Sequence, residues 1–270
     1  MIVFPNAKIN IGLNVLSKRP DGFHNIESLF YPIQLCDVLE IVEASDFAFT
    51  QSGIFFDACS EDNLVVKAFR MLQTRFSLPN IHIHLHKKIP VGAGLGGGSS
   101  DAAYMLCLLN DFFKLELSAS QLHTHALELG SDCPFFVDNI PAIAHGRGEI
   151  LTPFHVNLAR WFLVLVKPDI FVSTAEAYAG ITPVIPSETL LSMLEQPVRD
   201  WKQNVHNQFE QHVFQRYHEI EVLKTKMYSN GAVYASMSGS GSSVFGLFQS
   251  KPGNIEDVFR GSFIHTEVLK

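Results

Sequence analysis

The chain has 270 residues, of which 47% are apolar and 17% are charged, and its formal net charge is −7. These values exclude a disordered chain, which combines low hydrophobicity with a high net charge. They also argue against a nucleic-acid-binding protein, because no long run of lysine and arginine is present to neutralise a phosphate backbone. No apolar run approaches the roughly 20 residues that a membrane-spanning helix needs. The length allows one large domain or two small ones.

Strand-like and helix-like segments alternate in the first half of the chain. Polar and apolar residues alternate over most of residues 3–15 and throughout 81–86, which predicts strands there, and a further strand is predicted over residues 38–43. Helical patterns predict helices over residues 63–76, 102–113 and 118–129. We expect Asp62 to cap the first of these helices, Gly130 to end the last, and residues 92–101 to form a loop.

The second half has the same mixed character. Strands are expected over residues 161–166, 232–235 and 244–248 and at the C-terminal end, with a helix around 255–259. Apolar residues at helical spacing predict one continuous helix over 207–228, and a proline-punctuated connection over 182–197 holds a short helix. These elements predict an α+β fold of two lobes, residues 1–157 and 158–270.

Five glycines stand within seven residues between a predicted strand and a predicted helix: Gly92, Gly94, Gly96, Gly97 and Gly98. Glycine lets backbone N–H groups turn inward onto an anion, and the following helix adds its positive N-terminal end. The hydroxyls of Ser99 and Ser100 can add donors or help to hold a magnesium ion. This pattern predicts a phosphate-binding loop rather than a simple surface connector.

The same glycines admit a second interpretation. Gly92-x-Gly94-x-x-Gly97 matches the dinucleotide-binding fingerprint, and Asp111 or Glu116 lies near the expected acidic position. Against this, the motif stands in mid-chain, and no second half with parallel-strand patterning follows. No lysine closes the loop as a Walker A motif requires. The loop alone therefore predicts phosphate binding, and leaves a kinase, a nucleotide-dependent oxidoreductase and a non-catalytic nucleotide sensor open.

Three further features are ambiguous on their own. The loop Met237-Ser-Gly-Ser-Gly-Ser-Ser243 is either a flexible hairpin or a second wrap around phosphates. Lys8 and Asn10 lie two residues apart on one face of a predicted strand, where a lone lysine is usually solvated. Asp132 follows the end of a predicted helix and can simply cap the next turn.

Taken together, these segments resemble a known family. Pro5-x-x-Lys8-x-Asn10, Pro90-x-x-x-Gly94-Leu-Gly-Gly-Gly-Ser-Ser100 and the 237–243 loop are similar, in order and spacing, to the three motifs of the GHMP small-molecule kinases. The resemblance covers essentially the whole chain. It implies a ribosomal-protein-S5-domain-2-like N-terminal lobe and a ferredoxin-like C-terminal lobe.

The resemblance also implies an activity. The chain would transfer a phosphoryl group from ATP, with Mg²⁺ expected, to an alcohol group of a small molecule, without nucleic-acid or membrane partners. Residues 7–28, 130–136 and 146–149 are similar to the branch that phosphorylates a diphosphocytidyl sugar alcohol in non-mevalonate isoprenoid precursor synthesis. Another alcohol substrate within the family stays open. A bacterial, cytoplasmic location is expected, and scattered cysteines without paired spacing agree with a reducing compartment.

By the same resemblance, Asp132 is the general base, Lys8 is its charged partner, and Asn10 orients the alcohol. The implied ATP-binding residues are Pro90, Gly92, Gly94, Leu95, Gly96, Gly97, Gly98, Ser99 and Ser100, with Ser100 as a possible ligand of Mg²⁺. Cytosine would be bound by His24 and stacked between Phe23 and Tyr178, although both of these rings also suit core packing. The implied substrate-binding loop comprises Ser238, Gly239, Ser240 and Gly241. Asn207 stands in a segment that departs from the family's Asn-Asp pattern, so its role is left open.

Overall fold

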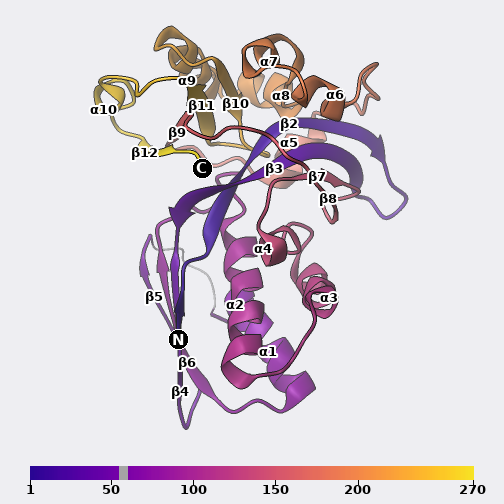
Figure 1. The fold of residues 1–270 in the computed structure, drawn as a ribbon, viewed down its shortest axis with the longest axis vertical. Helices are drawn as coiled ribbons and strands as arrows, with labels where there is room; N and C mark the ends of the chain where they lie inside the picture. Colours follow the sequence, from indigo (N-terminus) through magenta and orange to yellow (C-terminus); the bar gives the residue numbers. More distant parts are fainter. Residues whose placement is uncertain (55–59) are drawn as a thin grey trace. The chain divides into compact units, whose positions relative to one another are not determined.

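The computed structural model describes residues 1–54 and 60–270, and the chain divides into two compact units that interleave along the sequence (Figure 1). Unit 1 comprises Met1–Lys8, Gln34–Val91 and Gly96–Ile140. Unit 2 comprises Ile9–Ile33, Gly92–Leu95 and Pro141–Lys270. The chain thus passes from one unit to the other within a strand and within the glycine-rich loop. The division into lobes at residues 157 and 158 stays a prediction.

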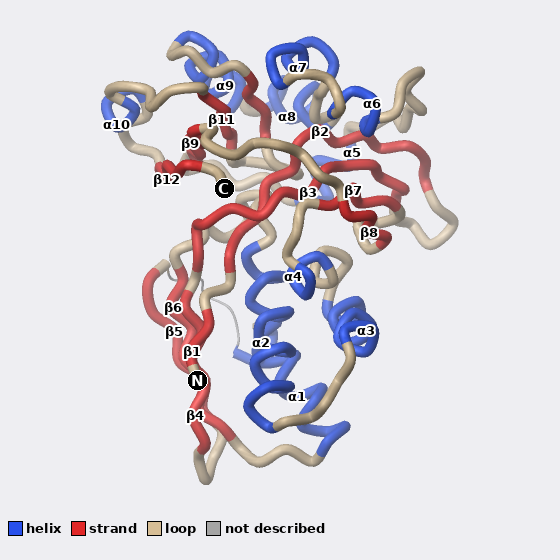
Figure 2. The backbone as a smooth tube through the Cα atoms, viewed as in Figure 1, coloured by secondary structure: helices blue, strands red, loops and turns tan. Residues whose placement is uncertain are grey.

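Unit 1 is built on a four-stranded sheet with helices packed against it (Figure 2). The strand order is β1 (Ile2–Val3), β4 (Val38–Glu43), β6 (Ile81–Lys87) and β5 (Ala48–Gly53). Strand β6 is antiparallel to β4 and parallel to β5. Its residues Ile81, Ile83 and Leu85 are buried against apolar side chains of the helices, which confirms the alternation seen in the sequence.

The helices of unit 1 are α1 (Leu64–Phe76), α2 (Gly97–Phe113), α3 (Ala119–Leu129) and α4 (Phe135–Asp138), with a 3₁₀ turn at Ser60–Asp62. Two predicted boundaries were wrong. Asn63, not Asp62, caps α1, because its Oδ1 accepts a hydrogen bond from the Val65 N–H at 2.9 Å. Helix α2 begins at Gly97, inside the predicted loop, because Gly96 takes a left-handed conformation and the chain coils directly after it.

A second sheet has the order β2 (Asn6–Lys18), β3 (His24–Cys36), β7 (Ala142–His145) and β8 (Ile150–Pro153). A third sheet, entirely within unit 2, has the order β10 (Tyr234–Met237), β11 (Val244–Phe248), β9 (Phe162–Lys167) and β12 (Phe263–Val268). All its pairings are antiparallel. The apolar core of unit 2 packs residues of this sheet against helices α8 (Phe209–Arg216) and α9 (His218–Ser229).

The continuous helix expected over residues 207–228 is wrong. Helix α8 ends at Arg216 and α9 begins at His218, because Tyr217 leaves the helical conformation with φ −128° and ψ 76°. Tertiary contacts hold this break: the Tyr217 hydroxyl donates to Glu176 Oε1 at 2.9 Å, and Arg216 pairs with the same carboxylate at 2.8 Å. The remaining helices of unit 2 are α5 (Thr174–Ala179), α6 (Leu190–Leu194), α7 (Val198–Asn204) and α10 (Ile255–Val258).

No helix in residues 1–54 and 60–270 has the length and apolar character needed to cross a bilayer. Cys36, Cys107 and Cys133 carry free thiols, and Cys59 lies outside the described residues.

A buried charge cluster ties three elements of unit 1 together. Lys87, at the end of β6, places its ammonium against the carboxylate of Asp37, which lies between β3 and β4, and at 2.7 Å from Oδ2 of Asp101 in α2. Asp37 Oδ1 also accepts hydrogen bonds from the N–H groups of Lys88 and Ile89. Burial raises the pKa of Asp101 to about 7, against the opposing effect of the Lys87 charge. The cluster fixes the strand before the glycine-rich loop to the helix after it.

We expect Lys87→Met to lower the free energy of unfolding by about 3–5 kcal/mol, because it leaves two buried carboxylates without their cation. Urea unfolding followed by circular dichroism measures the loss. The matched control is Lys67→Met, which removes an exposed ion pair with Asp62 at 3.5 Å and costs less than about 1 kcal/mol. Equal losses in the two variants would contradict this account of the cluster.

Candidate active site

Lys8 and Asp132, far apart in the sequence, form an ion pair within unit 1. Lys8 Nζ lies 3.3 Å from Asp132 Oδ2. The lysine comes from the start of β2 and its side chain is 5% exposed, whereas Asp132 stands in the turn between α3 and α4 and its side chain is 32% exposed. The structure thus pairs the two predicted catalytic residues, and the Asp132 side chain stays partly exposed.

The glycine-rich loop takes a conformation that favours glycine. Gly92, Gly94 and Gly96 all have left-handed backbones, with φ between 62° and 74°. A Cβ on Gly96 would lie 3.1 Å from Lys8 Cε and 3.0 Å from a ring carbon of Phe136, so a side chain at this position would crowd both residues. Gly96 also precedes α2 without a side-chain cap, and the first turn of α2 has no acidic residue. The N–H groups of that turn are therefore suited to an anion.

The remaining predicted ATP-binding residues flank this loop. Pro90 and Leu95 are buried, and Ser100 is fully buried at the start of α2. Ser99 hydrogen-bonds the thiol of Cys133, the neighbour of Asp132. Burial raises the pKa of this thiol to about 12, which keeps it protonated and excludes it as a nucleophile at neutral pH.

In unit 2, the three sequence motifs meet at one hydroxyl group. Ser238 Oγ donates to the Gly94 carbonyl oxygen at 2.8 Å and accepts a hydrogen bond from the Asn10 N–H at 3.2 Å. Ser238 is completely buried. A Cβ on Gly94 would lie 1.9 Å from the Ser238 carbonyl oxygen, so the backbones of the two loops are in direct contact. The side chain of Ser238 therefore joins the motifs to one another.

Asn10 is oriented by a residue that we did not single out from the sequence. Its Nδ2 donates to Ser28 Oγ at 2.9 Å, and that hydroxyl donates to the Gly12 carbonyl oxygen at 2.7 Å. Both Asn10 and Ser28 are buried, at 2% and 0% exposure. The only sequence signal for Ser28 is its place at the end of the N-terminal segment 7–28.

Two residues hold the 237–243 loop in place. Asn207 lies just before α8, and Glu210 lies within it. Asn207 Nδ2 donates to the carbonyl oxygens of Met237 and Gly239, both at 2.8 Å. Glu210 Oε1 accepts from the Met237 N–H at 2.8 Å, while its other oxygen pairs with Lys224 at 2.6 Å. Asn207 thus supports the loop, a role that the departure from the family pattern left open. Glu210 was missed because its partners lie more than 13 residues away in the sequence.

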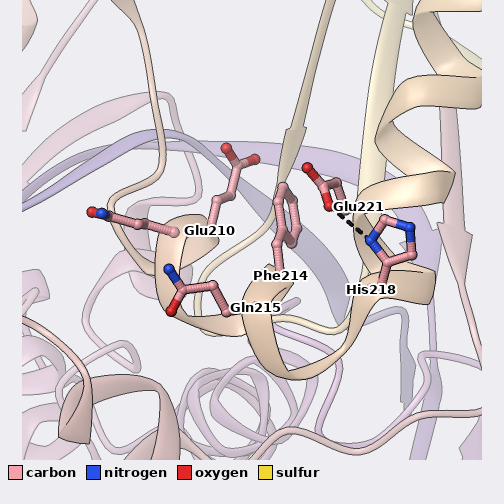
Figure 3. A pocket seen from close by; sticks show the side chains of 6 residues that line it. Glu210, Phe214, Gln215, His218 and Glu221 are labelled. Atoms are coloured by element: carbon pink, nitrogen blue, oxygen red, sulfur yellow. Dashed lines mark hydrogen bonds and ion pairs between the residues drawn. The ribbon is translucent and has the colours of Figure 1, made fainter.

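Glu210 also lines an open cavity of about 610 Å³ beside α8 and α9 (Figure 3). Its other lining residues are Gln211, Phe214, Gln215, His218 and Glu221. Within the cavity, His218 Nδ1 lies 2.9 Å from Glu221 Oε2. The lining contains none of the residues predicted to bind ATP or substrate.

The three residues predicted to bind cytosine, His24, Phe23 and Tyr178, all lie in unit 2. The rings of His24 and Tyr178 stack on each other, with centroids 4.8 Å apart and planes 16° apart. Phe23 is 53% exposed, and the Arg147 guanidinium lies 4.9 Å from its ring centroid. Burial, followed by the charge of Lys18, lowers the pKa of His24, which favours a neutral imidazole at neutral pH. A neutral ring can both donate and accept hydrogen bonds.

The dinucleotide interpretation of the glycines fails on sheet topology. The strand before the loop, β6, runs antiparallel to β4, and the sheet has the order β1-β4-β6-β5. A dinucleotide-binding half requires parallel strands with right-handed helical crossovers on both faces. Phosphate binding by this loop stays a prediction, without the other parts of the dinucleotide-binding fold.

The contact between Gly94 and Ser238 gives a sharp test. We expect Gly94→Ala to lower kcat/KM for ATP by about 100-fold, because the added methyl forces the two loops apart by an ångström or more. Gly231→Ala is the control: its backbone is also left-handed, at φ +93°, but nothing lies within 4 Å of the new methyl. The control should lose only about 1–2 kcal/mol of stability and no activity. Steady-state kinetics and thermal unfolding distinguish the two variants. Equal losses of kcat/KM in both would argue against a functional role of the contact between Gly94 and Ser238.

Comparisons with known proteins agree on one family. The sequence profile for the GHMP kinases N-terminal domain matches residues 63–147, and the profile for the GHMP kinases C-terminal domain matches residues 191–265. The protein named 4-diphosphocytidyl-2-C-methyl-D-erythritol kinase from Parabacteroides distasonis is 53% identical over 257 residues, which cover 95% of this chain and 94% of that protein. The protein of the same name from Bacteroides fragilis is 50% identical over 100% of both chains.

A solved structure gives the same result at the level of the fold. The crystal structure of a 4-(cytidine 5′-diphospho)-2C-methyl-D-erythritol kinase superposes with a TM-score of 0.83 at 30% identity, covering 98% of each chain. The expected two-lobe α+β kinase fold is thereby confirmed. The chain belongs to the GHMP kinases, in the branch whose curated members are named 4-diphosphocytidyl-2-C-methyl-D-erythritol kinase.

Proposed function

We propose that this kinase transfers the γ-phosphoryl group of ATP to the 2-hydroxyl group of 4-diphosphocytidyl-2-C-methyl-D-erythritol. The observation that carries the proposal is the 3.3 Å pair between Lys8 and Asp132, which stands in unit 1 together with the uncapped N-terminus of α2. A base, a cation and a phosphate site are the groups that phosphoryl transfer to an alcohol requires. The substrate is the one named for the relatives that align over nearly the whole chain.

The phosphates of ATP would be held by backbone rather than by many positive side chains. The N–H groups that follow Gly96 point out of the start of α2, where the helix carries partial positive charge. The left-handed glycines permit the close approach of a phosphate to this backbone. Ser99 and Ser100 supply hydroxyl groups in the same turn.

Asp132 would act as the general base and Lys8 as the cation. The bond between the γ-phosphorus and the β–γ bridging oxygen breaks, a bond from the γ-phosphorus to the substrate 2-oxygen forms, and ADP leaves. The hydroxyl proton passes to the Asp132 carboxylate as the new bond forms. Lys8 stabilises the negative charge on the transferring phosphoryl group, and its burial strengthens that interaction relative to water. Asn10, held by Ser28, would orient the sugar alcohol.

The cytosine end of the substrate would be bound in unit 2 by His24, Phe23 and Tyr178. A base stacked on an aromatic ring gains about 1–3 kcal/mol, and hydrogen bonds to the His24 imidazole would select its edge. His24 and Tyr178 stack on each other, so a base could bind on that face of Tyr178 only if the His24 ring moved. Otherwise the base would stack on Phe23. The exposed Phe23 ring is available for such a contact.

Magnesium would accompany ATP. The Ser100 hydroxyl is fully buried and has no hydrogen-bond partner among the described residues, and a hydroxyl oxygen is a ligand type that Mg²⁺ accepts. Ser100 would hold the ion together with phosphate oxygens, and the chemistry supplied there would be neutralisation of phosphate charge. Within residues 1–54 and 60–270, no group of three His, Cys, Asp or Glu side chains is placed to bind a metal without the nucleotide.

The role of Asp132 is tested by Asp132→Asn. We expect this variant to fold normally and to lose at least about 100-fold in kcat, the low end of what a positioned general base contributes, with little change in substrate KM. Asp138→Asn, six residues later and paired with His123 at 2.9 Å, is the matched control and should keep its turnover. Near-normal turnover of the Asp132 variant would remove it from the base role.

The substrate is tested by ATP consumption with a panel of alcohols. We expect turnover with 4-diphosphocytidyl-2-C-methyl-D-erythritol and at least about 1,000-fold lower kcat/KM with mevalonate, homoserine or galactose, because these lack the cytosine that unit 2 would bind. Turnover of one of the other alcohols would replace the substrate within the same family. Nucleotide binding without any turnover would support the sensor interpretation instead.

A further inference from the structure

A hydrogen-bonded trio of side chains lies in unit 1 beside the elements that carry Lys8 and Asp132. Asn6 Oδ1 accepts hydrogen bonds from the Tyr104 hydroxyl and from Asn139 Nδ2, both at 2.8 Å. Asn139 Nδ2 also donates to the Tyr104 hydroxyl oxygen at 3.1 Å. The three residues are thus bonded pairwise into a closed ring.

Each member comes from an element that positions part of the candidate site. Asn6 is the first residue of β2, two residues before Lys8. Tyr104 lies in α2, one turn after Ser100. Asn139 directly follows α4, the short helix that begins just after Asp132. The trio therefore links the strand of the cation, the helix of the phosphate site and the segment of the base.

The members are themselves fixed in place. Asn6 is 6% exposed, and its Nδ2 donates to the Ala7 carbonyl oxygen at 2.9 Å, so its amide is engaged at both ends. The Asn139 N–H closes α4 by bonding to the Phe135 carbonyl oxygen at 2.8 Å, in a left-handed conformation with φ 53°. Burial, before all other causes, raises the pKa of Tyr104 to about 12, so its hydroxyl stays protonated and donates at neutral pH.

We propose that Asn6, Tyr104 and Asn139 are positioning residues that set the distance between Lys8 and Asp132 during phosphoryl transfer. This inference rests on the proposed function, in which that pair is catalytic. The pair needs such support because Asp132 is one-third exposed and its 3.3 Å contact with Lys8 is longer than a tight charge-assisted hydrogen bond. A displacement of about 1 Å in a catalytic group can cost 100-fold in rate.

The first test is Tyr104→Phe, which removes one hydroxyl and keeps the ring. We expect kcat to fall by about 10- to 100-fold while the KM values for ATP and for the alcohol substrate stay within about twofold. Tyr228→Phe is the matched control in unit 2. Its hydroxyl also makes two hydrogen bonds, to the N–H and carbonyl groups of Ala235 at 3.1 Å, and its loss should leave kcat unchanged.

The second test asks whether the hydroxyl acts through the catalytic pair. In the double variant Asp132→Asn/Tyr104→Phe, residual turnover should equal that of Asp132→Asn alone, because positioning an absent base has no further effect. If the two substitutions reduce kcat independently, so that their effects multiply in the double variant, the proposal is overturned. An unchanged kcat in Tyr104→Phe, or an equal loss of kcat in Tyr228→Phe, would overturn it as well. If Asp132→Asn itself retains turnover, the catalytic assignment fails first, so the two failures are distinguishable.

A third variant covers the case in which Tyr104→Phe does not fold. Asn139→Gly deletes the amide but suits the left-handed backbone that follows α4, so it should fold and should not weaken the end of that helix. It is expected to show the same fall in kcat with unchanged KM values. Full turnover in Asn139→Gly would also overturn the proposal.

Discussion

The contact on which the candidate site depends is between two backbones. Gly94 and Ser238 approach so closely that a single added carbon would lie 1.9 Å from a carbonyl oxygen, and Ser238 Oγ completes the contact by bonding Gly94 and Asn10. Main-chain atoms form the contact on both sides. A change of side-chain rotamer therefore cannot relieve a clash at this point. The left-handed backbone of Gly94 is a second, separate reason for glycine at this position. One residue from each of the three motifs thus meets the other two at a single junction within unit 2.

The net charge of the chain and its local hydrogen-bond donors have different effects on anion binding. Its net charge of −7 is unfavourable for the binding of anions, yet phosphate binding at a helix start depends on local N–H groups rather than on total charge. Two buried lysines, Lys87 and Lys8, show that local surroundings decide what a charge does. Lys87 is enclosed by the carboxylates of Asp37 and Asp101 and serves the fold, whereas Lys8 lies beside the partly exposed Asp132. A buried cation next to an accessible carboxylate is suited to chemistry on a bound phosphate.

The sequence predicted the elements whose pattern is local. The strands at 38–43 and 244–248 were located correctly, and the alternation in β6 correctly indicated its buried face. Predictions failed where tertiary contacts decide. The break at Tyr217 is held by Glu176, some 40 residues earlier, and no helix-breaking residue marks it. Helix α2 starts inside the glycine run because glycine permits a helix as well as a loop, so composition alone could not locate its first residue.

The same limit applies to the site. The motifs singled out Lys8, Asp132 and the glycine-rich loop because their residue types suit phosphoryl chemistry, and the ion pair between Lys8 and Asp132 forms as the resemblance implied. The supporting residues have no such signal. Asn207, Glu210 and Ser28 are ordinary polar residues in sequence, and each acquires a role only when folding brings a loop carbonyl or amide to its side chain.

Support of this kind explains how an accessible carboxylate can still be accurately placed. A fully buried carboxylate would be held by packing, but a ligand could not reach it; the Asp132 side chain is 32% exposed and is correspondingly less restrained by its own contacts. Restraint must then come from the segments that carry it and its partner. The ring of hydrogen bonds through Asn6, Tyr104 and Asn139 supplies that restraint from groups that stay uncharged at neutral pH. Because neutral amides and a protonated phenol add no charge near the phosphates, the site gains rigidity without altering the electrostatics that the transfer requires.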